Sequence, residues 1–139
     1  MFKTVDELTA FIKRYRNLQL NTAFSQKSVD ELDYFIKTFS NPIYGEQGVA
    51  SVKKMIAARK QYVTEIEAET ANHNTALALV ELLAEPAHTI VKMRLIDGKD
   101  WLAVTDKVAY SRTQASRIFK AGLAEILARQ QEAFPQQHG

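Results

Sequence analysis

The chain has 139 residues, of which 46% are hydrophobic and 24% are charged, and its formal net charge is +2. This length suits one ordinary domain or a small domain on a helical extension, and the composition excludes a wholly disordered chain. The absence of cysteine excludes a disulfide framework and thiolate metal sites. No apolar run reaches the roughly 18 to 20 residues that span a bilayer, and the opening residues lack the layout of a signal peptide. We therefore expect a cytoplasmic protein with no membrane partner.

Two helix starts with the same signature are predicted near the N-terminus. Thr4 is followed three residues later by Glu7, and Ser28 is followed by Glu31, which is the spacing of a capping box. Apolar residues follow each start at helical spacing, and the first helix is predicted to run to about Ala23. The pattern fits either two helices or one helix with a bend at residues 25–27.

Residues 40–48 form the clearest predicted loop of the first half, because they hold one proline and two glycines. Beyond the loop, residues spaced alternately by three and four predict a long helix of a coiled coil or helical hairpin over residues 49–84. A helix of about 36 residues would be about 54 Å long, too long for the two preceding helices to cover unless they pack end to end along it. Any remaining apolar seam needs another chain, so we expect a homodimer. The predicted seam consists of Val49, Val52, Ile56, Arg59, Val63, Ile66, Thr70, His73, Leu77, Val80 and Ala84.

Two shorter helices are predicted in the second half of the chain. The first covers residues 86–98, since Pro86 is tolerated in a first turn and Gly98 suits a C-terminal cap. The second covers residues 101–108, where Asp100 can act as the N-cap. Both helices have an apolar face at helical spacing, which predicts that they pack together.

The most informative segment is the last predicted helix, over residues 111–129. Ser111 can cap it, and Gln114 can complete a capping box. Only two residues separate this helix from the one before it. A short helix, a tight turn and a polar-faced second helix form the order of a helix-turn-helix, whose second helix enters the DNA major groove. The polar face consists of Arg112, Thr113, Gln114, Ser116, Arg117 and Lys120.

Residues 90–101 and 108–112 resemble the helix-turn-helix with which bacterial sigma factors read the promoter −35 element. The likeness is closer to the ArpU/RinA-like phage late-gene transcription regulators, in which a helical N-terminal half precedes such a module. It is specific over residues 86–127 and only architectural over residues 1–85. The resemblance implies binding to double-stranded promoter DNA, and the six residues of the polar face match the family's recognition helix.

The chain departs from the family pattern at three positions. Thr105 stands where alanine is usual, Ala109 where the turn usually has glycine, and Ala115 where a branched aliphatic residue packs. Within the polar face, Arg112 and Arg117 are expected to make the strongest contacts, because guanidinium can bond two acceptors of guanine. Gln114 suits adenine but is also required by the capping box.

We find no cluster of residues that predicts catalysis or metal binding. The three histidines share no spacing that would bring three or four metal ligands together. Glu65, Glu67 and Glu69 point in different directions on a helix, and Ser111 has no base nearby in sequence. Glycine-rich phosphate loops are absent as well. We therefore expect no enzymatic activity, no metal site and no cofactor.

The sequence thus predicts an all-α protein with a helical hairpin or coiled-coil region over residues 1–85. A three-helix helix-turn-helix domain over residues 86–130 and a flexible tail over residues 131–139 follow. The predicted function is sequence-specific DNA binding in transcription regulation, for late-gene control in a phage or prophage, with RNA polymerase as a further candidate partner. Two alternatives stay open: a phage small terminase subunit that serves DNA packaging, and a helical adaptor that docks RNA polymerase without binding DNA.

Overall fold

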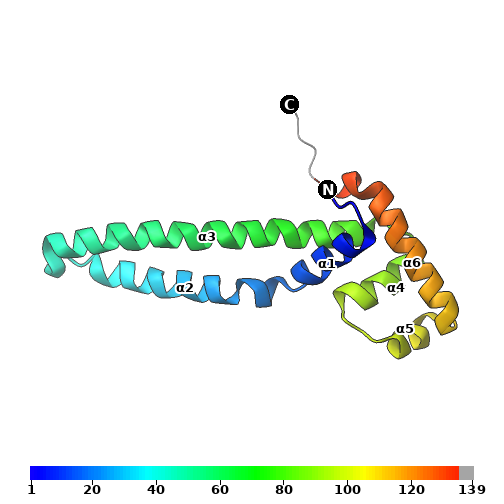
Figure 1. The fold of residues 1–139 in the computed structure, drawn as a ribbon. Helices are drawn as coiled ribbons and strands as arrows, with labels where there is room; N and C mark the ends of the chain where they lie inside the picture. Colours follow the sequence, from blue (N-terminus) through cyan, green and yellow to red (C-terminus); the bar gives the residue numbers. More distant parts are fainter. Residues whose placement is uncertain (135–139) are drawn as a thin grey trace. The chain divides into compact units, whose positions relative to one another are not determined.

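The computed structural model of the chain describes residues 1–134, and these residues form helices and no β-strand (Figure 1). The predicted all-α class is therefore confirmed. The elements are α1 (Val5–Tyr15), α2 (Leu18–Phe39), the 3-10 turn η1 (Pro42–Tyr44), α3 (Gly45–Glu81), α4 (Ala87–Val91), the π-helical turn η2 (Lys92–Ile96), α5 (Trp101–Val108), α6 (Arg112–Arg129) and the 3-10 turn η3 (Gln130–Ala133).

The chain divides into two compact units. Residues 18–71 form one unit, called the hairpin unit below, and residues 1–17 together with those from 72 onward form the other, called the core unit. The expected division after residue 85 differs from this one, because the apolar face of α1 packs with the C-terminal helices. Of the tail expected over residues 131–139, residues 131–133 belong to η3, and residues 135–139 lie outside the described residues.

The first N-terminal helix begins where expected, but the break between the two N-terminal helices lies elsewhere. Thr4 caps α1 as predicted, and its side chain accepts a hydrogen bond of 3.1 Å from the backbone N–H of Glu7. However, α1 ends at Tyr15, and α2 runs without interruption from Leu18 to Phe39. Ser28 therefore does not start a helix: its hydroxyl donates to the carbonyl of Phe24, which satisfies it inside α2.

Helices α2 and α3 lie side by side in the hairpin unit (Figure 1). The side chain of Arg59 on α3 is 2.6 Å from the carboxylate of Asp33 on α2, and Ser25 donates to Glu65 at 3.0 Å. On α2 the more buried residues recur at steps of three and four. They are Leu18, Thr22, Ser25, Val29, Leu32, Ile36 and Phe39.

The seam of α3 is shifted by one residue at two positions of the expected heptad in the first part of the helix. Val49 and Ile56, which we expected in the seam, are 71% and 54% exposed. Gly48 and Met55 take their places, and Gly48 is buried because the chain turns tightly there. A Cβ atom on Gly48 would lie 2.6 Å from the Tyr44 Cβ and 2.8 Å from the Phe39 carbonyl oxygen. The shift arises because apolar residues occupy two adjacent rows of α3, and packing against α2 decides between them.

The core unit is built around a cluster of buried apolar side chains. Leu8 and Ile12 of α1, which are fully buried, meet the end of α3 and the middle of α6. Polar contacts join distant parts of the same unit. The side-chain amide of Gln130 bonds both backbone groups of Phe2, and His73 Nδ1 lies 2.7 Å from the Tyr15 carbonyl oxygen. Together these contacts fix α1 against α6, the helix that carries the candidate site.

Candidate nucleic-acid interface on helix α6

Local hydrogen bonds determine the turn between α5 and α6. The Asp100 carboxylate caps α5 by accepting from the Ala103 N–H at 2.9 Å, as the sequence predicts. Helix α5 ends at Val108, and the C-cap residue Ala109 adopts a left-handed conformation with φ of 58° while its N–H donates to the Thr105 carbonyl. The left-handed region is where glycine is favoured, so alanine is strained here. This conformation reverses the chain within two residues, before α6 begins.

The predicted capping box is present at the start of α6. The Gln114 N–H donates to the Ser111 hydroxyl at 3.2 Å, and the Gln114 side-chain oxygen accepts from the Ser111 N–H at 3.3 Å. Two backbone donors that a helix start leaves unsatisfied are thereby bonded. The side chain of Gln114 is consequently engaged within the protein, although the residue is exposed.

Aromatic and aliphatic contacts hold α6 against α5. Val104 and Ala115 are fully buried together with Ile90. The Trp101 ring meets the Phe119 ring edge to face, with 5.5 Å between centroids, and the Arg94 guanidinium lies 4.8 Å from the Trp101 centroid on another side. Trp101 is thus part of the packing, and the opposite face of α6 is turned to solvent.

The solvent face of α6 carries an open hollow of about 430 Å³. Its lining residues follow one another at steps of one, three, one and three, so they share one side of the helix. They are Arg112, Thr113, Ser116, Arg117 and Lys120, and we call this surface the cationic face. Five of the six residues predicted as DNA-binding therefore lie together, and the sixth, Gln114, lies beside them in the capping box.

The three cations of the cationic face are not neutralised within the protein. Over residues 1–134, no carboxylate lies within ion-pair distance of Arg112, Arg117 or Lys120. Anions can therefore approach this face without first displacing an internal partner. Thr113 and Ser116 add hydroxyl groups that can donate to or accept from a ligand.

Arg129, which the sequence places on the same basic helix, has a structural role instead. Its guanidinium donates to both Glu132 carboxylate oxygens, at 2.9 and 3.1 Å, and to the Leu82 carbonyl at 2.9 Å. The hydrogen bond with Glu132 raises the pKa of Arg129 above its usual range. This arginine therefore holds the end of α6 to the rest of the core unit.

The structure also reveals a histidine cluster that the sequence analysis did not identify. His88 Nε2 lies 2.9 Å from the Glu81 carboxylate, and His88 Nδ1 lies 3.0 Å from the Glu85 carboxylate. The hydrogen bond with Glu81 raises the pKa of His88, and Glu85 adds to the effect. The separations of seven and three residues are helical spacings, so the signal for this group was present in the sequence, although α3 ends at Glu81 and α4 begins at Ala87.

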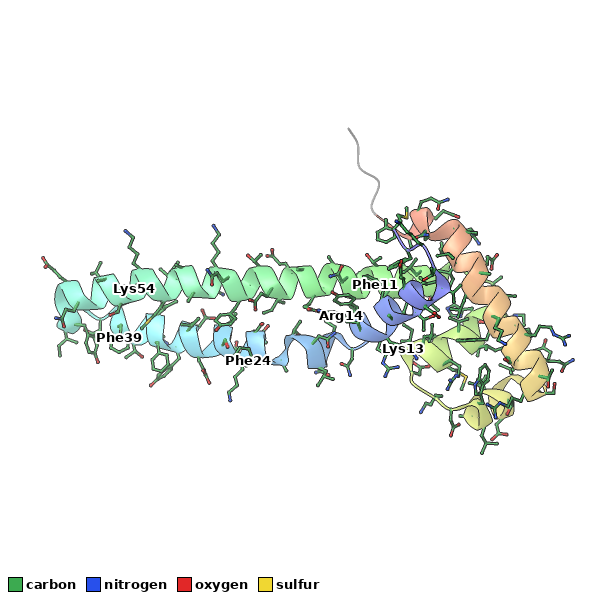
Figure 2. The ribbon with its side chains drawn as sticks, viewed as in Figure 1. Phe11, Lys13, Arg14, Phe24, Phe39 and Lys54 are labelled. Atoms are coloured by element: carbon green, nitrogen blue, oxygen red, sulfur yellow. The ribbon has the colours of Figure 1, made fainter. Side chains whose placement is uncertain are left out.

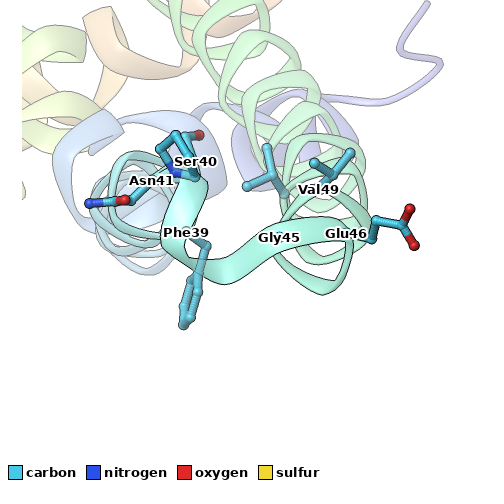
Figure 3. Close-up of a pocket in the computed structure, with 8 residues that line it drawn as sticks. Phe39, Ser40, Asn41, Gly45, Glu46 and Val49 are labelled. Carbon is cyan, nitrogen blue, oxygen red and sulfur yellow. The ribbon is translucent and has the colours of Figure 1, made fainter.

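A second hollow, of about 530 Å³, lies at the tip of the hairpin unit (Figure 3). It is mostly apolar, with Phe39 on one side and Val49 on the other, and Glu46 contributes the carboxylate of its rim. Ile43, in the turn beside it, is 81% exposed. Such a surface suits contact with an apolar group of another molecule and offers little chemistry for catalysis.

The described residues contain neither a metal-binding cluster nor a membrane-spanning helix. No group of three or more histidine, cysteine, aspartate or glutamate side chains within residues 1–134 could hold a metal ion. None of the helices in that range is long and apolar enough to cross a membrane.

Comparisons with protein-family models, with curated proteins and with solved structures each find no match for the chain. A function therefore has to follow from the geometry of the molecule itself.

Proposed function

We propose that the protein is a sequence-specific DNA-binding transcription regulator and that α5, the turn at Ala109 and α6 act as its helix-turn-helix. The observation that supports this proposal is the cationic face of α6, whose three cations have no carboxylate partner among residues 1–134. The B-DNA major groove is about 12 Å wide and admits an α-helix with its side chains. A rigidly capped helix with such a face is suited to that groove.

The residues of the cationic face differ in what they can recognise. The guanidinium groups of Arg112 and Arg117 can each bond O6 and N7 of guanine, which discriminates between base pairs. Lys120 is a further turn along α6 and presents a single ammonium, which suits a phosphate group. Thr113 and Ser116 can bond either base edges or phosphates. Gln114 contributes to the stability of the helix start, and we assign it no base contact.

The biological setting that we propose is late-gene control in a phage or prophage, with RNA polymerase as a further partner. Its support is the resemblance of residues 86–127 to the ArpU/RinA-like regulators. A phage small terminase subunit would use the same DNA-binding face at a packaging site. Mapping the bound DNA across a host and phage genome separates the two, since the regulator binds at a promoter and the terminase subunit does not.

A protein adaptor is the second candidate function, and the hairpin tip is the observation that favours it. The exposed Ile43 and the apolar hollow beside it could receive a side chain of another protein, such as an RNA polymerase subunit. An adaptor of this kind has no need for a cationic face that binds DNA. Measured DNA affinity therefore distinguishes the two functions.

The test compares Arg117→Ala with Lys120→Ala on a duplex selected from a random pool and on a scrambled duplex. Arg117→Ala is expected to cost about 1–3 kcal/mol on the selected duplex and to relax the preference for one base pair. Lys120→Ala is expected to weaken both duplexes about equally and to reduce the salt slope by about one per subunit. Fluorescence anisotropy at several salt concentrations measures both effects.

Lys37→Ala serves as the matched control, because it removes one exposed cation from the hairpin unit and leaves α6 intact. Its affinity for both duplexes should equal that of the wild-type protein. Equal losses for all three variants would indicate binding by net charge alone. Wild-type protein without salt-dependent DNA affinity would refute the proposal and leave the adaptor.

A further inference from the structure

Large apolar side chains are exposed along the outer side of α2. Leu20 and Phe24 are each 72% exposed, Tyr34 is 67% exposed and Phe35 is 43% exposed. None of them belongs to the seam of α2 that faces α3. Phe24, labelled in Figure 2, has a ring neighbour in Tyr62 at 6.1 Å between centroids, yet most of its surface remains open to solvent. Exposed aromatic side chains at this density mark a contact surface.

Three of these exposed residues, Leu20, Phe24 and Tyr34, belong to a regular stripe along α2 whose spacing is the same in both chain directions. Its members follow one another at steps of four, three, four, three and four residues, so the pattern is symmetric about the level of residue 29. The two central members are oppositely charged. We call the set the outer stripe, and it consists of Leu20, Phe24, Lys27, Glu31, Tyr34 and Thr38.

We propose that the outer stripe of α2 binds the outer stripe of a second copy of the chain in antiparallel orientation, about a two-fold axis level with residue 29. In this register Phe24 meets Tyr34 of the second copy, and Lys27 meets Glu31 of the second copy. Leu20 meets Thr38 of the second copy. Because the axis is two-fold, each of these pairs occurs twice, as an isologous interface requires.

An open hollow on α2 fits the central pair of this interface. It is lined by Lys27, Asp30, Glu31 and Tyr34, with Phe35 at its edge. The first four residues are spaced at i, i+3, i+4 and i+7. In knobs-into-holes packing, four residues at this spacing surround one side chain of the facing helix. Lys27 of the second copy is at the matching level: its alkyl stem can lie on Tyr34 and its ammonium can reach the two carboxylates.

Charge and burial together favour a second copy over an unrelated partner. A parallel arrangement would place Lys27 against Lys27 and Glu31 against Glu31, whereas the antiparallel one pairs opposite charges.

The hairpin unit has very little apolar core of its own. Among its described residues, Val29 is the only hydrophobic residue that is buried. Two helices with so little core gain stability from apolar contact with another chain. The dimer was expected through residues 49–84, but within the hairpin unit α2 of the same chain packs on that seam.

The test uses charge reversal in the full-length protein. Lys27→Glu places two acidic pairs in the interface and Glu31→Lys places two basic pairs, so each variant alone should weaken dimerisation by about tenfold or more. Mixed in equal amounts, the two variants should form a heterodimer, because each then supplies the charge that the other lacks. The double variant should dimerise like the wild-type protein. Sedimentation equilibrium at about 10 to 200 µM measures all of these states.

Lys53→Glu on α3 is the control, since it makes the same charge change outside the outer stripe and should leave dimerisation unchanged. Far-UV circular dichroism confirms that each variant stays helical. A wild-type monomer at 200 µM, single variants that dimerise as well as the wild type, or a mixture without heterodimer would overturn the proposal. None of these readouts involves DNA, so the inference stands or fails separately from the proposed function.

Discussion

The two units of the protein are stabilised in different ways. In the core unit, side chains from α1, the end of α3, η2 and α6 meet in one cluster, and Leu8, Ile12 and Ile126 are fully buried. Among the described residues of the hairpin unit, Val29 is the only hydrophobic residue that is buried, whereas Leu20, Phe24 and Tyr34 are largely exposed. Burial of apolar surface is the main source of folding stability. The core unit can therefore hold α6 rigidly, and the hairpin unit presents surface for contact with other molecules.

The largest expected effect is the loss of packing at Ile126. Ile126→Ala removes a fully buried side chain and should destabilise the core unit by about 2–5 kcal/mol. Ile56→Ala, where the side chain is 54% exposed, should change stability by less than about 0.5 kcal/mol. Urea unfolding measures both. Trp101, the single tryptophan, reports on the core unit by fluorescence, and circular dichroism includes the hairpin unit. Equal costs at the two positions would contradict the contrast between the units.

A smaller effect, of opposite sign, is expected at the turn before α6. Ala109 has φ of 58°, a conformation that costs an L-residue about 1 kcal/mol and glycine almost nothing. Ala109→Gly should therefore raise stability by about 0.5–1 kcal/mol after the greater freedom of glycine in the unfolded chain is counted. The control is Ala103→Gly within α5, which should lower stability by about 1 kcal/mol. Thermal unfolding of the two variants should shift the midpoint in opposite directions, and a loss in both would refute the strain at Ala109.

The smallest expected effect is a pH dependence confined to the core unit. The hydrogen bond with Glu81 raises the pKa of His88 above its ordinary value of 6.5. The resulting stability is fully present below pH 6.5 and is lost as pH rises through the higher pKa of the folded state. Since Glu81 and Glu85 are about two-thirds exposed, we expect no more than about 0.5–1 kcal/mol.

His88→Gln removes this contribution, and the difference from the wild type should be larger at pH 6 than at pH 8. The pKa of Glu85 is lowered by its hydrogen bond with Thr89, so its own contribution persists at pH 6 and is lost only as pH falls through that lowered value. Denaturant titrations at the two pH values give the difference. Hydrogen exchange in residues 18–71 should be the same in both proteins at each pH, and a difference between the two proteins there would contradict the assignment to the core unit.

The parts of the fold that the sequence predicted correctly rest on local interactions. The caps at Asp100 and Ser111 and the box completed by Gln114 each involve residues within a few positions of one another. The cationic face follows from the same logic, because one helix brings all its members together. A single capped helix can therefore be predicted without knowledge of what packs behind it.

The parts that were predicted incorrectly depend on distant residues. Ser28 has the spacing of a capping box, but the helix that begins at Leu18 continues through it. Two rows of α3 are apolar enough to form the seam, and contact with α2 selects the row that includes Gly48 and Met55. No local pattern indicated the structural role of Arg129, which depends on Glu132 and on the Leu82 carbonyl 47 residues away. The expected homodimer and DNA binding stay predictions that the experiments above test.

The capping box at Ser111 has a consequence for the thermodynamics of binding. A helix whose first turn frays must be ordered when it meets a ligand, and the lost conformational entropy reduces affinity. In this protein the bonds between Ser111 and Gln114 order that turn before any ligand arrives, and Arg112 and Thr113 lie between the two bonded residues. The backbone that carries these side chains is thus already in its helical conformation. Association at this end of α6 therefore begins from a preorganised surface, with a smaller entropic penalty.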